Sequence, residues 1–193
     1  MATDRGLLIV LSGPSGCGKG TLVSRILERN PDTVLSVSVT TRAPRPGEID
    51  GVHYYFKTVE QVEQMISDDA LLEYAKYSGN YYGTPREAVE QHLSAGHNVI
   101  LEIEVQGAMQ VMERAEDYVS VFLTVPSMEE LERRLRGRGT EEESFIQARM
   151  QAADFEMQHI DRYQYVVLND VVDDAVARLE AIIHQEKTRR TPQ

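Results

Sequence analysis

A glycine-rich segment near the N-terminus, residues 13–19 with the sequence GPSGCGK, constrains the fold more than any other part of the chain. It follows a continuous apolar run at residues 7–11, typical of a strand buried on both faces, and opens a helical pattern over residues 18–28. Glycines let backbone N–H groups wrap around an anion, the helix N-terminus adds positive partial charge, and Lys19 adds a cation. In this strand-to-helix context the pattern G-x-x-x-x-G-K predicts a phosphate-binding loop rather than a ligand-free turn.

Strand-like and helix-like patterns alternate along the rest of the chain. We expect strands at residues 34–39, 99–104, 119–125 and 165–168, and helices at residues 59–67, 127–135 and 171–187. Residues 40–57 predict a loop followed by a short strand. Capping-box sequences at residues 84–87, 127–130 and 140–143 each predict the start of a helix. This order predicts an α/β protein with a mainly parallel sheet.

The composition excludes several classes of protein. The 193 residues suit a single domain, and the formal net charge of −11 argues against non-specific nucleic-acid binding, which needs a basic surface. The lone cysteine, Cys17, excludes an intramolecular disulfide and a cysteine-based zinc site. No apolar run approaches the roughly 20 residues of a membrane span. We therefore expect a soluble, cytoplasmic protein with no nucleic-acid or membrane partner, and the sequence leaves its oligomeric state open.

The residue after the loop lysine departs from the usual motif. A serine or threonine hydroxyl commonly reaches Mg²⁺ from this position, which is Gly20 here, and Thr21 follows it. Either Thr21 supplies the hydroxyl, or Mg²⁺ is held mainly by phosphates and water, because this ion keeps several waters when bound. The run Gly-Lys-Gly-Thr is familiar from nucleoside monophosphate kinases.

Two arginines, Arg42 and Arg45, stand three residues apart in a proline-rich stretch. Two guanidinium groups on such a stiff loop can bind one phosphate dianion, and a solvated surface pair is the alternative. Four motifs follow one another along the chain: GPSGCGK at residues 13–19, SVSVTTRAPR at 36–45, GNYYG at 79–83 and RLRGRG at 134–139. In this order they resemble guanylate kinase, and the resemblance runs over about residues 6–186.

The resemblance implies a fold and a reaction. The fold would be a three-layer α/β P-loop kinase with a mainly parallel five-stranded core sheet, a small mixed GMP-binding subdomain and a helical lid. The single domain 1–193 would divide into a core of residues 1–36, 88–126 and 151–193, a GMP-binding segment at 37–87 and a lid at 127–150. The reaction would be Mg²⁺-dependent transfer of the γ-phosphoryl group of ATP to GMP, giving ADP and GDP.

The resemblance also assigns site residues by position. It implies that ATP is bound by the loop residues Gly13, Pro14, Ser15, Gly16, Cys17, Gly18, Lys19, Gly20 and Thr21, with Asn169 near adenine. It implies that GMP is bound at its phosphate by Arg42, Arg45, Tyr54 and Tyr82, and at guanine by Ser38, Glu73, Thr84 and Glu104. The catalytic residues would be Lys19 and the lid arginines Arg134, Arg138 and Arg149. Mg²⁺ would be held by Thr21 and, through water, by Glu102.

The chemistry of guanine agrees with this assignment. A carboxylate such as Glu73 accepts hydrogen bonds from N1–H and the 2-amino group, and hydroxyls such as Ser38 and Thr84 can donate to O6. Adenine reverses the pattern at position six and lacks the 2-amino group, so it would leave a buried carboxylate unpaired. Glu102 and Glu104 lie two apart on a predicted strand, and we expect them to share a face at its carboxyl end, where ligands bind in open α/β sheets. Which of the two reaches guanine stays open.

Two other functions compete with this interpretation. A kinase for AMP, UMP or a sugar phosphate would not need the guanine-binding residues. A non-catalytic guanylate-kinase-like domain that binds protein partners would tend to lose Lys19, Arg42 or Arg45, and all three are present. Because Cys17 lies within the loop, we also expect a bulky thiol reagent to inhibit the protein and ATP to protect it.

Overall fold

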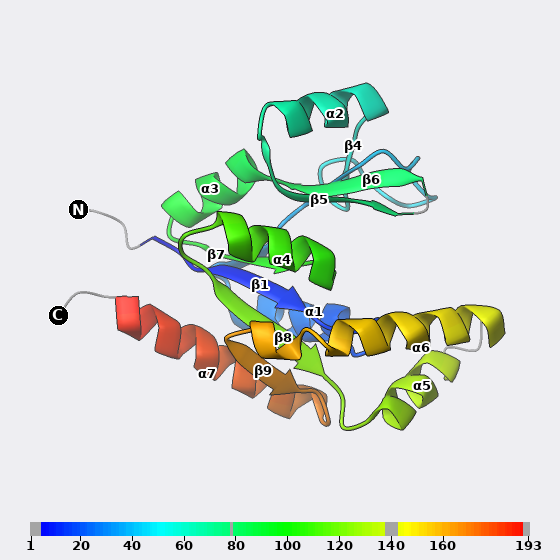
Figure 1. Ribbon diagram of the computed structural model, residues 1–193. Helices are drawn as coiled ribbons and strands as arrows, with labels where there is room; N and C mark the ends of the chain where they lie inside the picture. Colours follow the sequence, from blue (N-terminus) through cyan, green and yellow to red (C-terminus); the bar gives the residue numbers. More distant parts are fainter. Residues whose placement is uncertain (1–4, 78, 138–142, 191–193) are drawn as a thin grey trace.

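The computed structural model describes residues 5–77, 79–137 and 143–190, which form two sheets flanked by helices (Figure 1). The larger sheet has five strands in the order β2-β7-β1-β8-β9, and every neighbouring pair is parallel. Its strands are β1 (Leu8–Ser12), β2 (Thr33–Leu35), β7 (Asn98–Glu102), β8 (Val119–Thr124) and β9 (Tyr165–Leu168). The prediction of an α/β protein with a parallel five-stranded core sheet is confirmed.

Helices cover both faces of this sheet. On one face lie α1 (Lys19–Arg29) and α7 (Val172–Arg190), and on the other lie α3 (Arg86–Ser94) and α4 (Val105–Arg114).

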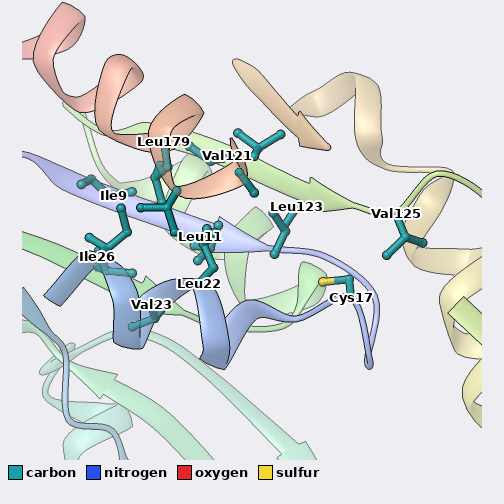
Figure 2. Close-up of a cluster of buried hydrophobic side chains, with 14 of the residues drawn as sticks. Ile9, Leu11, Cys17, Leu22, Val23, Ile26, Val121, Leu123, Val125 and Leu179 are labelled. Atoms are coloured by element: carbon teal, nitrogen blue, oxygen red, sulfur yellow. The ribbon is translucent and has the colours of Figure 1, made fainter. Parts of the chain in front are cut away.

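Alternate side chains of the central strand β1 point into the two layers of the core. Ile9 and Leu11 belong to the cluster covered by α1 and α7 (Figure 2), whereas Leu8 and Val10 belong to the cluster covered by α3 and α4. A strand covered on both faces needs apolar residues at successive positions. The uninterrupted apolar run before the glycine-rich segment therefore encodes a central strand.

The smaller sheet is mixed and stands beside the core sheet (Figure 1). Its strand order is β4-β3-β6-β5, where β3 is parallel to β4 and antiparallel to β6, and β5 is antiparallel to β6. Its elements are β3 (Val39–Thr40), β4 (Tyr55–Phe56), α2 (Val59–Ser67), β5 (Leu71–Tyr77) and β6 (Asn80–Pro85). A small cluster formed by Val39, Val62 and Leu71 joins α2 to the sheet.

Two further helices extend beyond the carboxyl ends of the core strands (Figure 1). They are α5 (Met128–Arg136) and α6 (Glu143–Met157), and a 3₁₀ turn at Ile160–Arg162 follows them. Ser127 caps α5 as predicted, because its hydroxyl accepts a hydrogen bond from the Glu130 N–H at 3.2 Å. The capping box predicted at residues 140–143 falls largely outside the described residues. Within the part of the chain that is described, no helix combines the length and apolarity needed to cross a bilayer.

Two sequence predictions about strands are wrong in their boundaries. The single strand expected at residues 34–39 is two strands in different sheets, because β2 ends at Leu35 and β3 begins at Val39. The strand expected to run to Glu104 ends at Glu102, and Glu104 is the N-cap residue of α4. In both places the chain leaves the core sheet, and a local pattern of residues does not record which sheet a strand joins.

The helix start predicted at residues 84–87 is confirmed, because α3 begins at Arg86, but the predicted capping role of Thr84 is wrong. Thr84 lies within β6 and is buried, and α3 begins at Arg86 with Pro85 as its N-cap and no side-chain capping bond. The Thr84 hydroxyl donates instead to the Glu73 carboxylate at 2.7 Å. A tertiary hydrogen bond has replaced the local one that the sequence favours.

The core placement predicts the effect of truncating Phe122. This side chain is 0% exposed and packs edge-on against Tyr163, with ring centroids 5.1 Å apart. Because Phe122→Ala leaves a cavity, it should lower the free energy of unfolding by about 3–5 kcal/mol in chemical denaturation. The control Val166→Ala, on edge strand β9 with 51% exposure, should change it by about 0.5 kcal/mol or less. Similar losses in the two variants would contradict this core.

Candidate functional site

The loop between β1 and α1 follows a path that requires glycine. Gly13 and Gly18 have φ angles of 149° and 99°. A Cβ atom at Gly13 would lie 2.1 Å from the Leu123 carbonyl oxygen, and one at Gly18 would lie 2.4 Å from the Asn169 Nδ2 atom. No side chain fits at such distances, so these glycines allow the loop to lie directly against β8 and the turn after β9. The predicted phosphate-binding loop thus has the strand-to-helix setting that its motif requires.

Lys19 begins α1, and its ammonium group lies over the loop. The Nζ atom donates hydrogen bonds to the carbonyl oxygens of Gly13, at 2.5 Å, and Pro14, at 3.3 Å. Two carboxyl groups, Glu102 and Glu156, interact electrostatically with it; burial raises the pKa of each, and the nearby ammonium partly offsets that rise. An anion held by the loop N–H groups would meet the Lys19 cation there.

Asn169 and Arg134 both contact the glycine-rich loop at the Cys17 carbonyl oxygen. Asn169 is 2% exposed, and its Nδ2 atom donates to the Cys17 carbonyl oxygen at 2.7 Å. Arg134 donates from Nη2 to the Asn169 carbonyl oxygen at 2.9 Å and from Nε to Glu130 Oε1 at 2.7 Å. Asn169 and Arg134, which the sequence assigns to ATP binding and catalysis, thus contact the loop and each other.

The two other arginines assigned to the lid are Arg149 and Arg138. Arg149 on α6 lines a cavity of about 650 Å³ together with Ser15, Glu104 and Glu156. This cavity therefore lies between the loop, the N-terminal end of α4 and α6. Arg138, the remaining predicted catalytic arginine, lies outside the described residues.

A second cavity, of about 240 Å³, collects most of the residues predicted to bind GMP. Its lining includes Ser38, Tyr54, Glu73, Tyr82 and Glu104. These residues come from the mixed sheet and its connections and from the end of the core strand β7. The structure therefore brings together side chains that the sequence spreads over residues 38–104.

Glu73 forms the buried end of this second cavity. Its side chain is 5% exposed, and the Thr84 hydroxyl donates to its Oε1 atom at 2.7 Å. Burial raises the pKa of the Glu73 carboxyl, the Thr84 hydroxyl opposes the rise, and the Glu104 carboxylate adds to it. A buried carboxylate with one such bond still has acceptor capacity for further donors.

Arg42 and Arg45 are joined by a residue that the sequence analysis missed, Glu48. Its Oε1 atom accepts a hydrogen bond from Arg42 Nη2 at 2.9 Å, and its Oε2 atom accepts one from the Arg45 backbone N–H at 2.7 Å. The Arg42 hydrogen bond lowers the pKa of Glu48 to about 2. Arg42 also lies 5.4 Å from the centre of the Tyr54 ring, which in turn is 6.1 Å from the Tyr82 ring. The sequence signal that could have identified Glu48 is its position three residues after Arg45.

The two cavities adjoin each other. Tyr77, Glu104 and Gln106 line both of them, so a group bound at the glycine-rich loop and a group bound near Glu73 would meet at this shared wall. The Oε1 atom of the neighbouring acid Glu102 would be 3.9 Å from a Cβ atom at Gly20. Glu104 interacts with both Glu73 and Glu156. Both acids line the cavity around Glu73, so which of them reaches guanine stays a prediction.

The oxygen donors beside the loop suit a magnesium ion carried by phosphates. Within the described ranges, no group of three or more histidine, cysteine, aspartate or glutamate side chains could hold a metal ion. The Glu102 carboxylate is an oxygen donor near Lys19 and Gly20, and Thr21, an exposed residue with a hydroxyl, follows Gly20 in the chain. Mg²⁺ takes oxygen ligands, keeps several waters and commonly binds through substrate phosphates, so these residues fit it.

Comparisons with known proteins find relatives that match nearly the whole chain. A sequence model of the guanylate kinase family matches residues 5–186. A guanylate kinase of Desulfitobacterium hafniense is 53% identical over 189 residues, which cover 98% of this chain and 94% of the relative. One of Clostridium perfringens is 50% identical, covering 96% of this chain and 86% of the relative. The crystal structure of guanylate kinase from Anaplasma phagocytophilum aligns with a TM-score of 0.75 and 36% identity, covering 97% of this chain and 89% of that one.

The orientation of Cys17 corrects one expectation from the sequence. The residue is part of the loop, but its side chain is 0% exposed and joins the core cluster beside Leu11 and Leu123 (Figure 2). Burial raises the pKa of the Cys17 thiol, which lowers its reactivity further. A bulky aromatic disulfide should therefore leave the native thiol unmodified at pH 8, with or without ATP, and should modify it fully in denaturant. Rapid colour release from the native protein would contradict this placement.

Proposed function

The chain belongs to the guanylate kinase family, and from this premise we infer that it transfers the γ-phosphoryl group of ATP to GMP, giving ADP and GDP. Its three-layer fold is that of a P-loop kinase. One observation supports the transfer most directly: the cavity beside the glycine-rich loop and the cavity around Glu73 share the wall of Tyr77, Glu104 and Gln106. A donor and an acceptor phosphate bound in these cavities would be neighbours.

On the donor side, the backbone N–H groups of the loop residues 13 and 15–19 bind the ATP phosphates in this proposal. Lys19 turns from the carbonyl oxygens of Gly13 and Pro14 to the outer phosphates, which are stronger acceptors because they are charged. Arg134 and Arg149 then act on the transferring group, and Asn169 keeps the loop in place through its bond to the Cys17 carbonyl. Arg138 has the same assigned role from sequence alone.

On the acceptor side, Arg42, Arg45, Tyr54 and Tyr82 bind the phosphate of GMP. The hydrogen bond that Arg42 donates to Glu48 holds Arg42 in one orientation. Other N–H groups of its guanidinium can then donate to the phosphate. Glu73 accepts from N1–H and the 2-amino group of guanine, with Ser38, Thr84 and Glu104 around the base. The Thr84 hydroxyl acts here by orienting the Glu73 carboxylate.

Phosphoryl transfer requires the protein to position the two nucleotides and to neutralise the charge of the transferring group. The acceptor is already an anionic phosphate, so no side chain has to remove a proton from it, and Lys19 and the arginines neutralise the charge of the transferring group. When bound with ATP, Mg²⁺ would supply further neutralisation of phosphate charge, with Glu102, through water, and Thr21 as its protein donors. Exclusion of water needs the predicted lid, residues 127–150, and the GMP-binding segment, residues 37–87, to close over the core. The proposal includes a cytoplasmic location, where ATP is available.

A substrate panel tests the function. Coupled ADP release should be fast with GMP and with dGMP, which carries the same base, and near background with AMP, UMP and CMP, because only guanine offers both donors to Glu73. Lys19→Ala should remove the GMP-dependent signal while circular dichroism shows a folded protein, which excludes a contaminating kinase. Preference for another monophosphate, or turnover retained without Lys19, would sink the proposal.

Glu73→Gln separates base recognition from folding. The change should raise the KM for GMP by about ten- to hundredfold, the range for losing a hydrogen bond to a charged group, and leave the KM for ATP within about twofold. Folding raises the pKa of this carboxyl above 4.5, so the wild-type protein loses stability as pH rises through that raised pKa. The neutral amide avoids this loss, and the variant should unfold at the same or a higher temperature at pH 7. Equal losses for GMP and ATP would mean that the base site lies elsewhere.

A further inference from the structure

The strand that carries Glu73 departs from regular pairing at that residue. β5 runs antiparallel to β6, and the register shifts between Leu71 and Glu73. Leu71 packs in the small cluster under α2, and Leu72 packs in the core cluster covered by α3 and α4. An irregularity of this kind changes the direction of the following side chain. Here the register shift comes directly before Glu73, and the Glu73 carboxylate lies against α4.

α4 has a gap where the carboxylate meets it. A Cβ atom at Gly107 would lie 2.7 Å from Glu73 Oε2 and 3.2 Å from its Cδ atom. Gly107 is buried in the interior of the helix, where glycine is the poorest helix former apart from proline. The helix thus has an unfavourable residue at the one turn where the Glu73 carboxylate needs room.

Gln110, one turn further along α4, fixes the backbone beside Glu73. Its Oε1 atom accepts from the Tyr74 N–H at 3.2 Å, and its Nε2 atom donates to the Tyr74 carbonyl oxygen at 2.9 Å. β5 is an edge strand of the mixed sheet, so its outer backbone groups have no strand partner. The Gln110 amide takes the place of that partner at a single residue, the one that follows Glu73.

We propose that Gly107 and Gln110 are positioning residues that set the preference of this site for guanine. The inference rests on the proposed function, in which Glu73 accepts from guanine. Thr84 holds one carboxylate oxygen, the gap at Gly107 accommodates the other, and Gln110 holds the adjoining backbone. A Glu73 carboxylate that is held in one direction can accept from both donors of guanine at once, so it favours guanine over a base that offers one donor. A carboxylate that has moved from this direction no longer meets both donors well, and this preference falls.

The ratio of activities with GMP and IMP measures this positioning. IMP keeps O6 and N1–H and lacks the 2-amino group, so the ratio of the two kcat/KM values reports the bond between that group and Glu73. Gly107→Ala and Gln110→Ala should each lower the ratio by about tenfold, close to the value of one hydrogen bond to a charged group, with the KM for ATP unchanged. The matched control Glu113→Ala, at an exposed position of α4, should keep the wild-type ratio.

A second comparison shows whether the two residues act through Glu73. In a Glu73→Ala background no carboxylate remains to be displaced, so adding Gly107→Ala or Gln110→Ala should change the ratio no further. If Gly107→Ala fails to fold, Gln110→Ala and its double variant decide the question. A wild-type ratio in the folded single variants, or a further fall in the Glu73→Ala background, overturns the proposal. A Glu73→Ala variant that keeps the wild-type ratio would instead overturn the assignment of Glu73 to guanine, and the inference with it.

Discussion

The contact of the glycine-rich loop with the ends of β8 and β9 is the constraint on which the rest of the site depends. Gly13 approaches the Leu123 carbonyl, and Gly18 approaches Asn169, at distances that no side chain permits. This contact brings the N-terminus of α1 and Lys19 beside Glu102 and within reach of Arg134. A bulkier residue at either glycine would move the loop, the lysine and the arginine together, because Lys19 continues the loop backbone and Arg134 donates to the Cys17 carbonyl oxygen of the loop.

Carboxylates organise the cationic parts of an acidic chain. The net charge of −11 would oppose binding of two polyanionic nucleotides if the charges were evenly spread. Instead Glu48 orients Arg42, and Glu130 orients Arg134. Each pairing leaves part of the guanidinium available and fixes its direction. In the proposed function, these acids do not prevent the arginines from binding phosphate; they reduce the number of orientations that the arginines would otherwise lose on binding.

Sequence reasoning succeeded where the chemistry is local and failed where partners are distant. The glycine-rich loop, the central strands and the set around the second cavity were predicted, because motif spacing and apolar runs record them directly. Thr84 was misassigned to a helix cap because its partner Glu73 lies on another strand. The Cys17 thiol was expected to react with a bulky reagent unless ATP protected it, because the sequence places the residue in the loop and does not show that its side chain points into the core. Glu156, Gly107 and Gln110 carry no motif, and the helix α4 was not anticipated.

The sequence by itself determined the class of fold, the strand-to-helix setting of the glycine-rich loop and the types of side chain that the proposed function assigns to two nucleotide phosphates and a base. Those features depend on short-range steric and hydrogen-bonding preferences that any chain with the same local residues would share. Only the tertiary structure decided that Glu102 and Glu104 line one cavity with Glu73, and that a gap at Gly107 receives the Glu73 carboxylate. The physical reason is that these distances follow from how β7, α4 and β5 pack together, and packing depends on the whole core at once.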